Sequence, residues 1–70
     1  MNEIKKNSIV TIREGTKSYD GKRIPEFLYG INCYVINVNG EMVTVGMDNH
    51  VIAVVKKSDL LLIKKSMEMT

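Results

Sequence analysis

The sequence predicts a single all-β domain made of short strands. Val, Ile and Tyr are frequent, and no long segment shows the period of about 3.6 residues that marks an amphipathic helix. The pair Asn39-Gly40 separates two β-prone runs, which is the strongest short-range signal for a β-hairpin. Seventy residues suffice for one domain, so we expect residues 1–70 to form one unit with an ordered core at about residues 8–63.

The first strand is predicted over residues 8–14. Val10 and Ile12 alternate with polar neighbours, which is the pattern of a strand with one buried face. Gly15 ends this strand, and a long irregular stretch follows over residues 15–30. A loop of this length in so small a domain is usually functional, or packed onto the domain by its own side chains.

The next two strands are predicted over residues 31–38 and 41–47. We expect Asn39 and Gly40 to form the turn between them, both with positive φ. Alternation in the first run places Cys33 and Val35 on one face. The opposite face is expected to carry Tyr34, Ile36 and Val38.

The rest of the chain completes the pattern. Residues 47–50 are expected to form a turn, residues 51–55 a buried strand and residues 56–59 a one-turn helical corner. A closing strand follows at residues 60–63, and residues 64–70 form a polar tail. This order predicts a five-stranded SH3-like barrel with a long loop after its first strand, a closed meander that hides its edges.

Size and composition limit how such a domain is stabilised. A chain of this length buries only about 60% of the surface that its unfolded form exposes, so disulfides, metals or oligomerisation usually assist. The single cysteine, Cys33, excludes an intrachain disulfide, and Cys33 and His50 are the only strong soft metal ligands. We therefore expect no metal and no cofactor, and self-association into a homo-oligomer is the remaining aid.

Charge and hydropathy bear on partners and location. Ten basic and eight acidic residues are mixed along the chain and give a net charge of +2, which does not favour nucleic acid as the partner. No apolar stretch near the N-terminus resembles a signal peptide, and the longest apolar run, residues 51–55, is too short to cross a bilayer. We expect synthesis in the cytoplasm and no membrane partner.

Residues for catalysis are scarce. Nucleophilic catalysis needs a Ser or Cys close to a His and an orienting carboxylate, whereas Cys33 lies mid-strand, where a free cysteine is usually a small core side chain. His50 lies beside Asp48 at a turn, where an exposed loop histidine is favoured over a ligand-facing one. The glutamates fall in separate predicted elements. We do not expect an enzyme.

The aromatic residues are few and concentrated in the long loop. Phe27 is expected to pin the loop to the barrel, because it lies among apolar neighbours. Tyr19 and Tyr29 either do the same or line a shallow groove, together with the turn at residues 48–50, for a sugar or short peptide. The predicted ligand-binding residues are Tyr19, Asp20, Phe27, Tyr29, Tyr34, Asp48 and His50.

Three segments resemble a known family. Residues 15–27, G-T-K-S-Y-D-G-K-R-I-P-E-F, are similar to the "G-a-k-y-y-n-G-k-k-I-P-x-W" stretch of bacterial SH3-type cell-wall-binding domains, which close many endolysins and amidases of phages of Gram-positive bacteria. Residues 34–36 resemble the family's "Y-Y-V" strand, and residues 54–60 its "A-V-x-x-x-D-L" ending. Phe27 stands where Trp is common in the family, and Cys33 where a second aromatic residue is common.

The resemblance implies a non-catalytic module that binds the Gram-positive cell wall, through peptidoglycan or an associated glycan, and targets a peptidoglycan hydrolase to it. Similar endolysins of enterococcal-type phages also produce free binding modules that assemble with the full-length enzyme, so further copies and a full-length endolysin are the implied protein partners. Because the chain begins with Met1, we expect a shortened form or the product of an internal start in a longer gene. It would be made in the host cytoplasm and act at the wall.

Two other functions fit the same sequence pattern. An SH3-like barrel can bind nucleic acid, although that function predicts stronger positive charge and aromatic residues interleaved with arginine on one face. The domain can also be a purely structural oligomerisation unit, in which exposed tyrosines form the interface between copies.

Overall fold

The computed structural model describes residues 4–64, which form one antiparallel sheet of five strands in the order β4-β3-β2-β1-β5. The predicted all-β class and the number of strands are confirmed. Two single-turn 3-10 helices, η1 and η2, interrupt the connections. The elements are β1 (Ile9–Ile12), η1 (Glu26–Leu28), β2 (Asn32–Asn39), β3 (Met42–Met47), β4 (His50–Lys56), η2 (Lys57–Asp59) and β5 (Leu60–Lys64).

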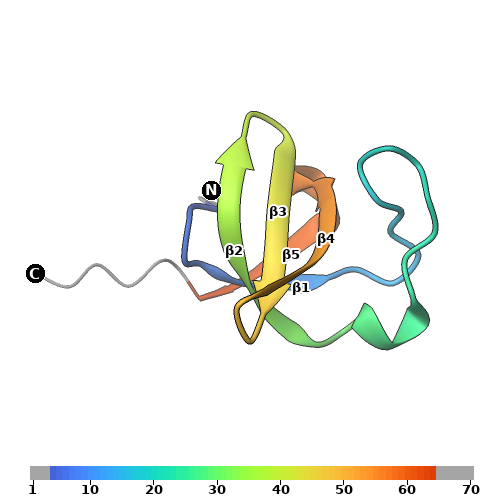
Figure 1. Cartoon of the computed structure of the whole chain (residues 1–70), viewed down its shortest axis with the longest axis horizontal. Coiled ribbons are helices and arrows are strands. Elements are labelled where there is room, and N and C mark those ends of the chain that lie inside the picture. The colour runs from blue at the N-terminus through green and yellow to red at the C-terminus, as the bar shows by residue number, and fades with distance from the viewer. Residues whose placement is uncertain (1–3, 65–70) are drawn as a thin grey trace, which may run out of the picture.

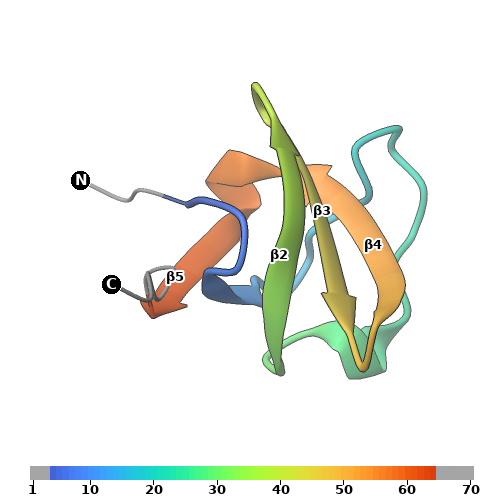
Figure 2. The same ribbon diagram turned by 60° about the vertical axis from the view of Figure 1, so that its left-hand side comes forward.

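The sheet curls over on itself around the core. In Figures 1 and 2, β1 and β5 run steeply across β2, β3 and β4. The predicted corner before the last strand is confirmed as η2, where Lys57 N donates to Glu41 O (2.8 Å) and Arg13 N to Asp59 O (3.2 Å). These two hydrogen bonds connect η2 to the β2–β3 turn and to the residue that follows β1.

Within the described residues, hydrogen bonds do not close the sheet, because β4 and β5 do not pair. The expected hydrogen-bonded closure is therefore wrong, although the strand order is compatible with a small SH3-like fold. η2 turns the chain between β4 and β5, so the two strands leave the corner toward different partners, β3 and β1.

The core is built mainly from β-branched side chains on the inner faces of the strands. Alternation of buried and partly exposed residues in β1 and β3 follows from the period of two in a strand. Ile24 and Leu28 belong to the long loop, so the loop is packed into the core. Ile4 extends the core four residues ahead of the predicted start. The buried residues are Ile4, Val10, Ile12, Ile24, Leu28, Cys33, Val35, Val43, Val45, Val55 and Leu60.

A bulge in β2 changes which residues share a face. The pairing with β3 shifts between Val35 and Asn37, and Val38 then lies opposite the buried Val43. Directly opposed residues lie on one face of an antiparallel pair, so Val38 packs against the core. The prediction that Val38 shares a face with Tyr34 is wrong, because the extra residue in the bulge reverses the alternation.

The prediction that residues 51–55 form a buried strand is also wrong. Only Val55 is buried, and Val51 is 60% exposed. β4 is an edge strand that pairs with β3 on one side. On its other side, the long loop makes one backbone hydrogen bond to it, from Tyr19 N to Val54 O (2.7 Å).

Both hairpin turns are tight, but the first differs from the prediction. Asn39 pairs with Met42 at the end of β2, so the turn residues are Gly40 and Glu41, and only Gly40 (φ 62°) has positive φ. A glycine at the first central position is the pattern of a type II′ turn. The β3–β4 turn has the double positive φ of a type I′ turn, at Asp48 (φ 50°) and Asn49 (φ 66°).

Gly46→Ala should destabilise the domain by about 1–3 kcal/mol, the usual cost of overpacking a well-packed site. A Cβ at residue 46 would lie 2.5 Å from the carbonyl oxygen of His50 and 2.5 Å from Cδ1 of Ile36. The His50 carbonyl belongs to the paired strand, so it cannot move aside without disturbing the pairing.

Urea unfolding of the two proteins measures this difference. The matched control is Thr44→Ala on the same strand, which should cost less than about 1 kcal/mol because Thr44 is only partly buried. Equal losses for the two variants would contradict the close approach at Gly46.

Candidate functional site

The tip of the long loop is a compact turn held by its own hydrogen bonds. Ser18 N donates to Lys22 O (2.9 Å), and Lys22 N donates to the Ser18 hydroxyl (3.0 Å). The same hydroxyl donates to the Asp20 carboxylate. This hydrogen bond is the main cause that lowers the pKa of Asp20, so the carboxylate stays ionised as part of the turn.

Two backbone hydrogen bonds fasten the loop to the rest of the domain, and a third hydrogen bond joins its two arms. At its base, the Tyr29 hydroxyl donates to the carbonyl of the buried Thr16 (2.7 Å), and Gly30 N donates to Ile12 O (3.2 Å). At its tip, Tyr19 N donates to Val54 O (2.7 Å). The loop is therefore a fixed part of the surface, and it is hollowed on both sides.

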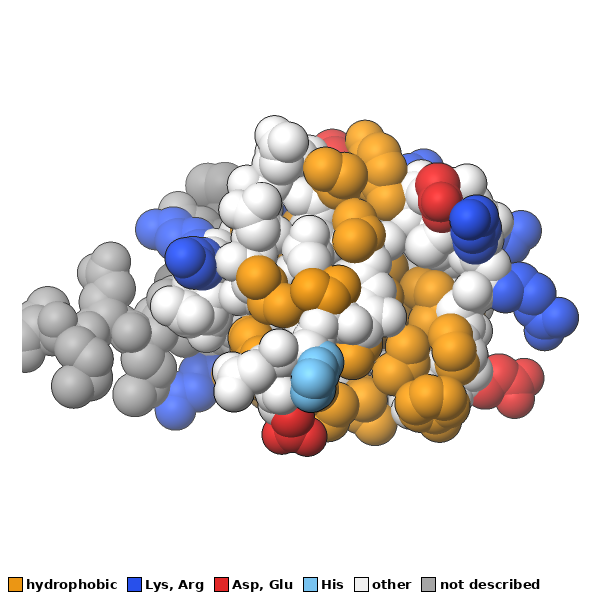
Figure 3. Space-filling model, in the orientation of Figure 1, with side chains coloured by type: hydrophobic (Ala, Val, Ile, Leu, Met, Phe, Trp, Pro, Cys, Tyr) orange, Lys and Arg blue, Asp and Glu red, His pale blue; other side chains and the backbone are white. Residues whose placement is uncertain are grey.

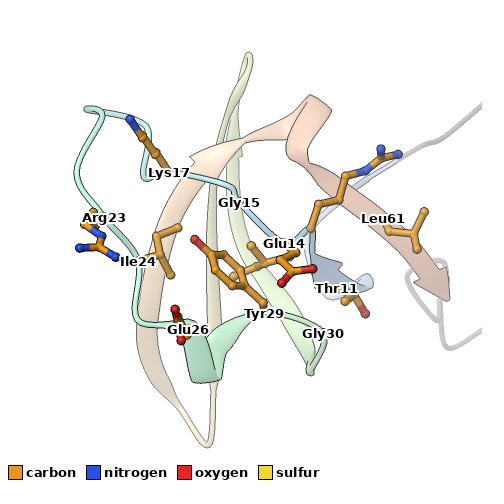
Figure 4. Close-up of a pocket in the computed structure, with 12 residues that line it drawn as sticks. Thr11, Glu14, Gly15, Lys17, Arg23, Ile24, Glu26, Tyr29, Gly30 and Leu61 are labelled. Atoms are coloured by element: carbon orange, nitrogen blue, oxygen red, sulfur yellow. The ribbon is translucent and has the colours of Figure 1, made fainter.

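The first hollow, here called the Tyr29 hollow, has a volume of about 840 Å³ and lies between the loop, β1 and β5. Figure 4 shows the Tyr29 ring in its centre, with Leu61 on the β5 side. Charged side chains surround this ring, and they are Arg13, Glu14, Lys17, Arg23 and Glu26.

The charges of the Tyr29 hollow have both signs and do not neutralise one another. All five side chains are exposed, and none forms an ion pair with another described residue. The ion pair of the loop lies elsewhere, at its tip, where Lys22 Nζ is 4.0 Å from Asp20 Oδ2. Cationic and anionic groups are thus both available to a ligand in one hollow.

The second hollow, here called the Tyr19 hollow, has a volume of about 460 Å³ and lies between the loop tip and β4. Its lining is more apolar, because β4 contributes Ile52, Ala53 and Val54. Tyr19 is 44% exposed at its edge. Arg23 and Ile24 line both hollows, so the two hollows lie on either side of one short segment of the loop.

The structure separates the predicted ligand-binding residues into different places. Tyr19 and Asp20 line one hollow and Tyr29 lines the other, so they do not form the single groove that we expected. The turn at residues 48–50 lines neither hollow. It is joined to Tyr34, whose hydroxyl accepts a hydrogen bond from Asn49 N (2.8 Å) and so caps the turn.

Phe27 lies outside both hollows and is 76% exposed. The expectation that it pins the loop is wrong, because Leu28 and Ile24 are the loop residues buried in the core. The single turn of η1 directs Leu28 inward and leaves Phe27 at the surface. Figure 3 shows apolar side chains gathered over this region, from η1 across β4 toward the β3–β4 turn.

Sequence reasoning missed the five charged residues of the Tyr29 hollow. They are spread over residues 13–26 and look like ordinary solvated loop positions in the sequence. What brings them together is the folding back of the loop, marked by the bridge between Lys17 and Arg23. The one sequence signal available was the alternation of both charge signs within a loop that also carries tyrosines.

Cys33 is confirmed as a buried core residue. Its thiol donates to Val10 O (3.4 Å), and burial raises its pKa to about 11, so the reactive thiolate is disfavoured. Within residues 4–64, no three His, Cys, Asp or Glu side chains gather as a metal site would require. The same residues contain no helix with the length and apolar character needed to span a membrane.

Comparison with known proteins identifies no relative: no family model, curated protein or solved structure matches the chain.

Tyr29→Phe should lower the free energy of unfolding by about 0.5–1.5 kcal/mol, because it removes the hydrogen bond to Thr16 O while it keeps the ring. Amide hydrogen exchange should accelerate first in residues 16–23, since the base of the loop loses a fastening point. Tyr34→Phe is the matched control, and it should change exchange at the β3–β4 turn instead. The same exchange pattern in both variants would contradict the role given to Tyr29.

The Cys33 thiol should make stability fall as the pH rises from about 9 to 11. The unfolded thiol ionises near its ordinary pKa of 9.0, whereas the folded thiol keeps its proton to about 11, so ionisation stabilises the unfolded state relative to the folded state in this window. We expect a loss of about 1–2 kcal/mol. Denaturant unfolding at several pH values measures it. Cys33→Ala should lack this part of the slope, and identical slopes in the two proteins would contradict the assignment.

Proposed function

We propose that this chain is a non-catalytic module that binds the Gram-positive cell wall and targets a peptidoglycan hydrolase to it. One observation carries the proposal: the loop over residues 15–30 is fastened in place and holds two adjacent hollows beside exposed tyrosine and charged side chains. The segment with the strongest resemblance to cell-wall-binding domains, residues 15–27, lies within this same loop.

The chemistry of the hollows suits a polar polymer. The Tyr29 ring offers an apolar face to a sugar ring or an aliphatic chain, and the surrounding charges supply hydrogen-bonding groups. Because the loop is already ordered, a ligand does not have to fix it at an entropic cost. Exposed groups of this kind give weak binding at one site, and several linked sites raise the avidity by orders of magnitude.

The proposed function includes assembly with further copies and with a full-length endolysin. Phe27 and Val51 are strongly exposed apolar side chains, and apolar side chains cover the surface between η1 and the β3–β4 turn in Figure 3. Burial of such surface between copies would supply the stabilisation that a 70-residue domain lacks.

Nucleic acid is a weaker fit to the same surface. The cations of the Tyr29 hollow share it with Glu14 and Glu26, and a phosphate backbone would meet both carboxylates. DNA is therefore the appropriate competitor in a binding test.

The proposal predicts that the chain, labelled fluorescently at its α-amine, binds purified Gram-positive cell walls. The buried Cys33 is avoided as the labelling site. Tyr19→Ala should weaken binding at least about fivefold, which is the usual loss when a contacting aromatic anchor is truncated. The fold should remain intact, because Tyr19 contacts β4 through its backbone N–H.

Ile63→Ala is the matched control, because Ile63 is 50% exposed on β5 and lines neither hollow. Its wall binding should equal that of the unaltered chain. Failure of the folded protein to bind walls, or binding to DNA at the expense of walls, would overturn the proposal.

A further inference from the structure

The Tyr29 hollow holds charges of both signs that have no partner among the described residues. Lys17 and Arg23 are brought together by the bridge that joins the two arms of the loop. In Figure 4, Glu14 and Glu26 lie closer to the Tyr29 ring, on the sides of β1 and η1. Lys17 and Arg23 thus place cations along the loop arms, Arg13 adds one next to Glu14, and the two glutamates lie nearer the ring.

This distribution of charges favours a ligand that carries both a cationic and an anionic group. A polyanion would be attracted by Lys17 and Arg23 and repelled by the two glutamates. A neutral glycan would cover charged groups without offering them an opposite charge. A ligand with one cationic and one anionic group, joined by a short apolar stem, matches both ends and can lay its stem over the Tyr29 ring.

We propose that the Tyr29 hollow binds a short zwitterionic peptide, with its ammonium group near Glu14 and Glu26 and its carboxylate near Lys17 and Arg23. This inference rests on the proposed function and deepens it. In a bacterial wall, both groups occur on a peptide that has not been cross-linked, because cross-linking converts the amine into an amide. The module therefore recognises uncross-linked peptide ends of the wall.

Because the loop is fastened, the peptide must match fixed positions of the ring and charges as well as their signs. The hydrogen bond from the Tyr29 hydroxyl to Thr16 O (2.7 Å) holds the ring among the charged side chains of the hollow. All of the charges are exposed, so each contact changes affinity only severalfold and is weakened by salt. Discrimination arises because two contacts of opposite sign must both be satisfied.

The test is a titration of the full chain, followed by NMR chemical shifts, with a synthetic tetrapeptide that carries one lysine ammonium and a free C-terminal carboxylate. Amides around the Tyr29 hollow should shift. Acetylation of the ammonium should weaken binding at least about threefold, as should amidation of the carboxylate, and higher ionic strength should weaken binding by the intact peptide.

Charge-neutralising variants show which side chains contact the ammonium end of the peptide and which contact its carboxylate end. Glu26→Gln should reduce the effect of ammonium acetylation and keep the full effect of carboxylate amidation, whereas Lys17→Gln should show the reverse. This exchange of sensitivities cannot come from a general loss of folding. Glu41→Gln and Lys56→Gln are matched controls outside both hollows, and they should behave as the unaltered chain does.

Absence of binding, or equal binding of the intact, acetylated and amidated peptides, would overturn the inference. Wall binding that depends on Tyr19 would leave the proposed function standing in that case. Conversely, failure to bind walls would overturn the proposed function, while the peptide titration would still decide the inference about the Tyr29 hollow.

Discussion

The burial of Ile24 and Leu28 in the core is the constraint on which the surface with the two hollows depends. The strands alone supply few inner side chains, because β1 has only four residues and β4 buries only Val55. The long loop completes the core from outside the sheet. The loop cannot swing away without exposing this apolar area, so the charged and aromatic residues on either side of these two buried positions are held in place by the stability of the domain.

This coupling also explains the unequal protection of the sheet edges. β4 carries an uncharged sequence over residues 51–55, without the lysines or prolines that usually guard an edge strand. The loop covers β4 around Val54 through the Tyr19 N–H and leaves Val51 exposed. One segment therefore does two things: it shields part of an edge strand, and it forms the walls of two hollows.

The sequence predicted the features that depend on local pattern. Period-two alternation located the strands within one or two residues, and the polar break before Leu60 located η2. The features it did not reveal depend on register. The bulge that turns Val38 toward the core, and the displacement of the first turn to Gly40 and Glu41, are decided by how β2 pairs with β3 along its whole length.

The same limit applies to the candidate site. Tyr19 and Tyr29 were identifiable because aromatic residues are rare in this chain, but their placement in separate hollows depends on the path of the loop. Phe27 and Leu28 are neighbours in an apolar run, and the direction of η1 alone decides which of them is buried. The charges around Tyr29 form a group only once Lys17 and Arg23 face each other.

Exposed charges are poor sources of affinity, and this fits the task that we propose for them. A solvated ion pair contributes about 0–1 kcal/mol, so no single contact in the Tyr29 hollow can hold a module on a surface. A polymeric wall presents its repeating groups at high local density, and linked modules bind such a surface through avidity. Under those conditions, a site gains more by rejecting ligands of the wrong charge than by binding the right one tightly. A hollow that presents cations and anions around one ring on a fastened loop provides that rejection.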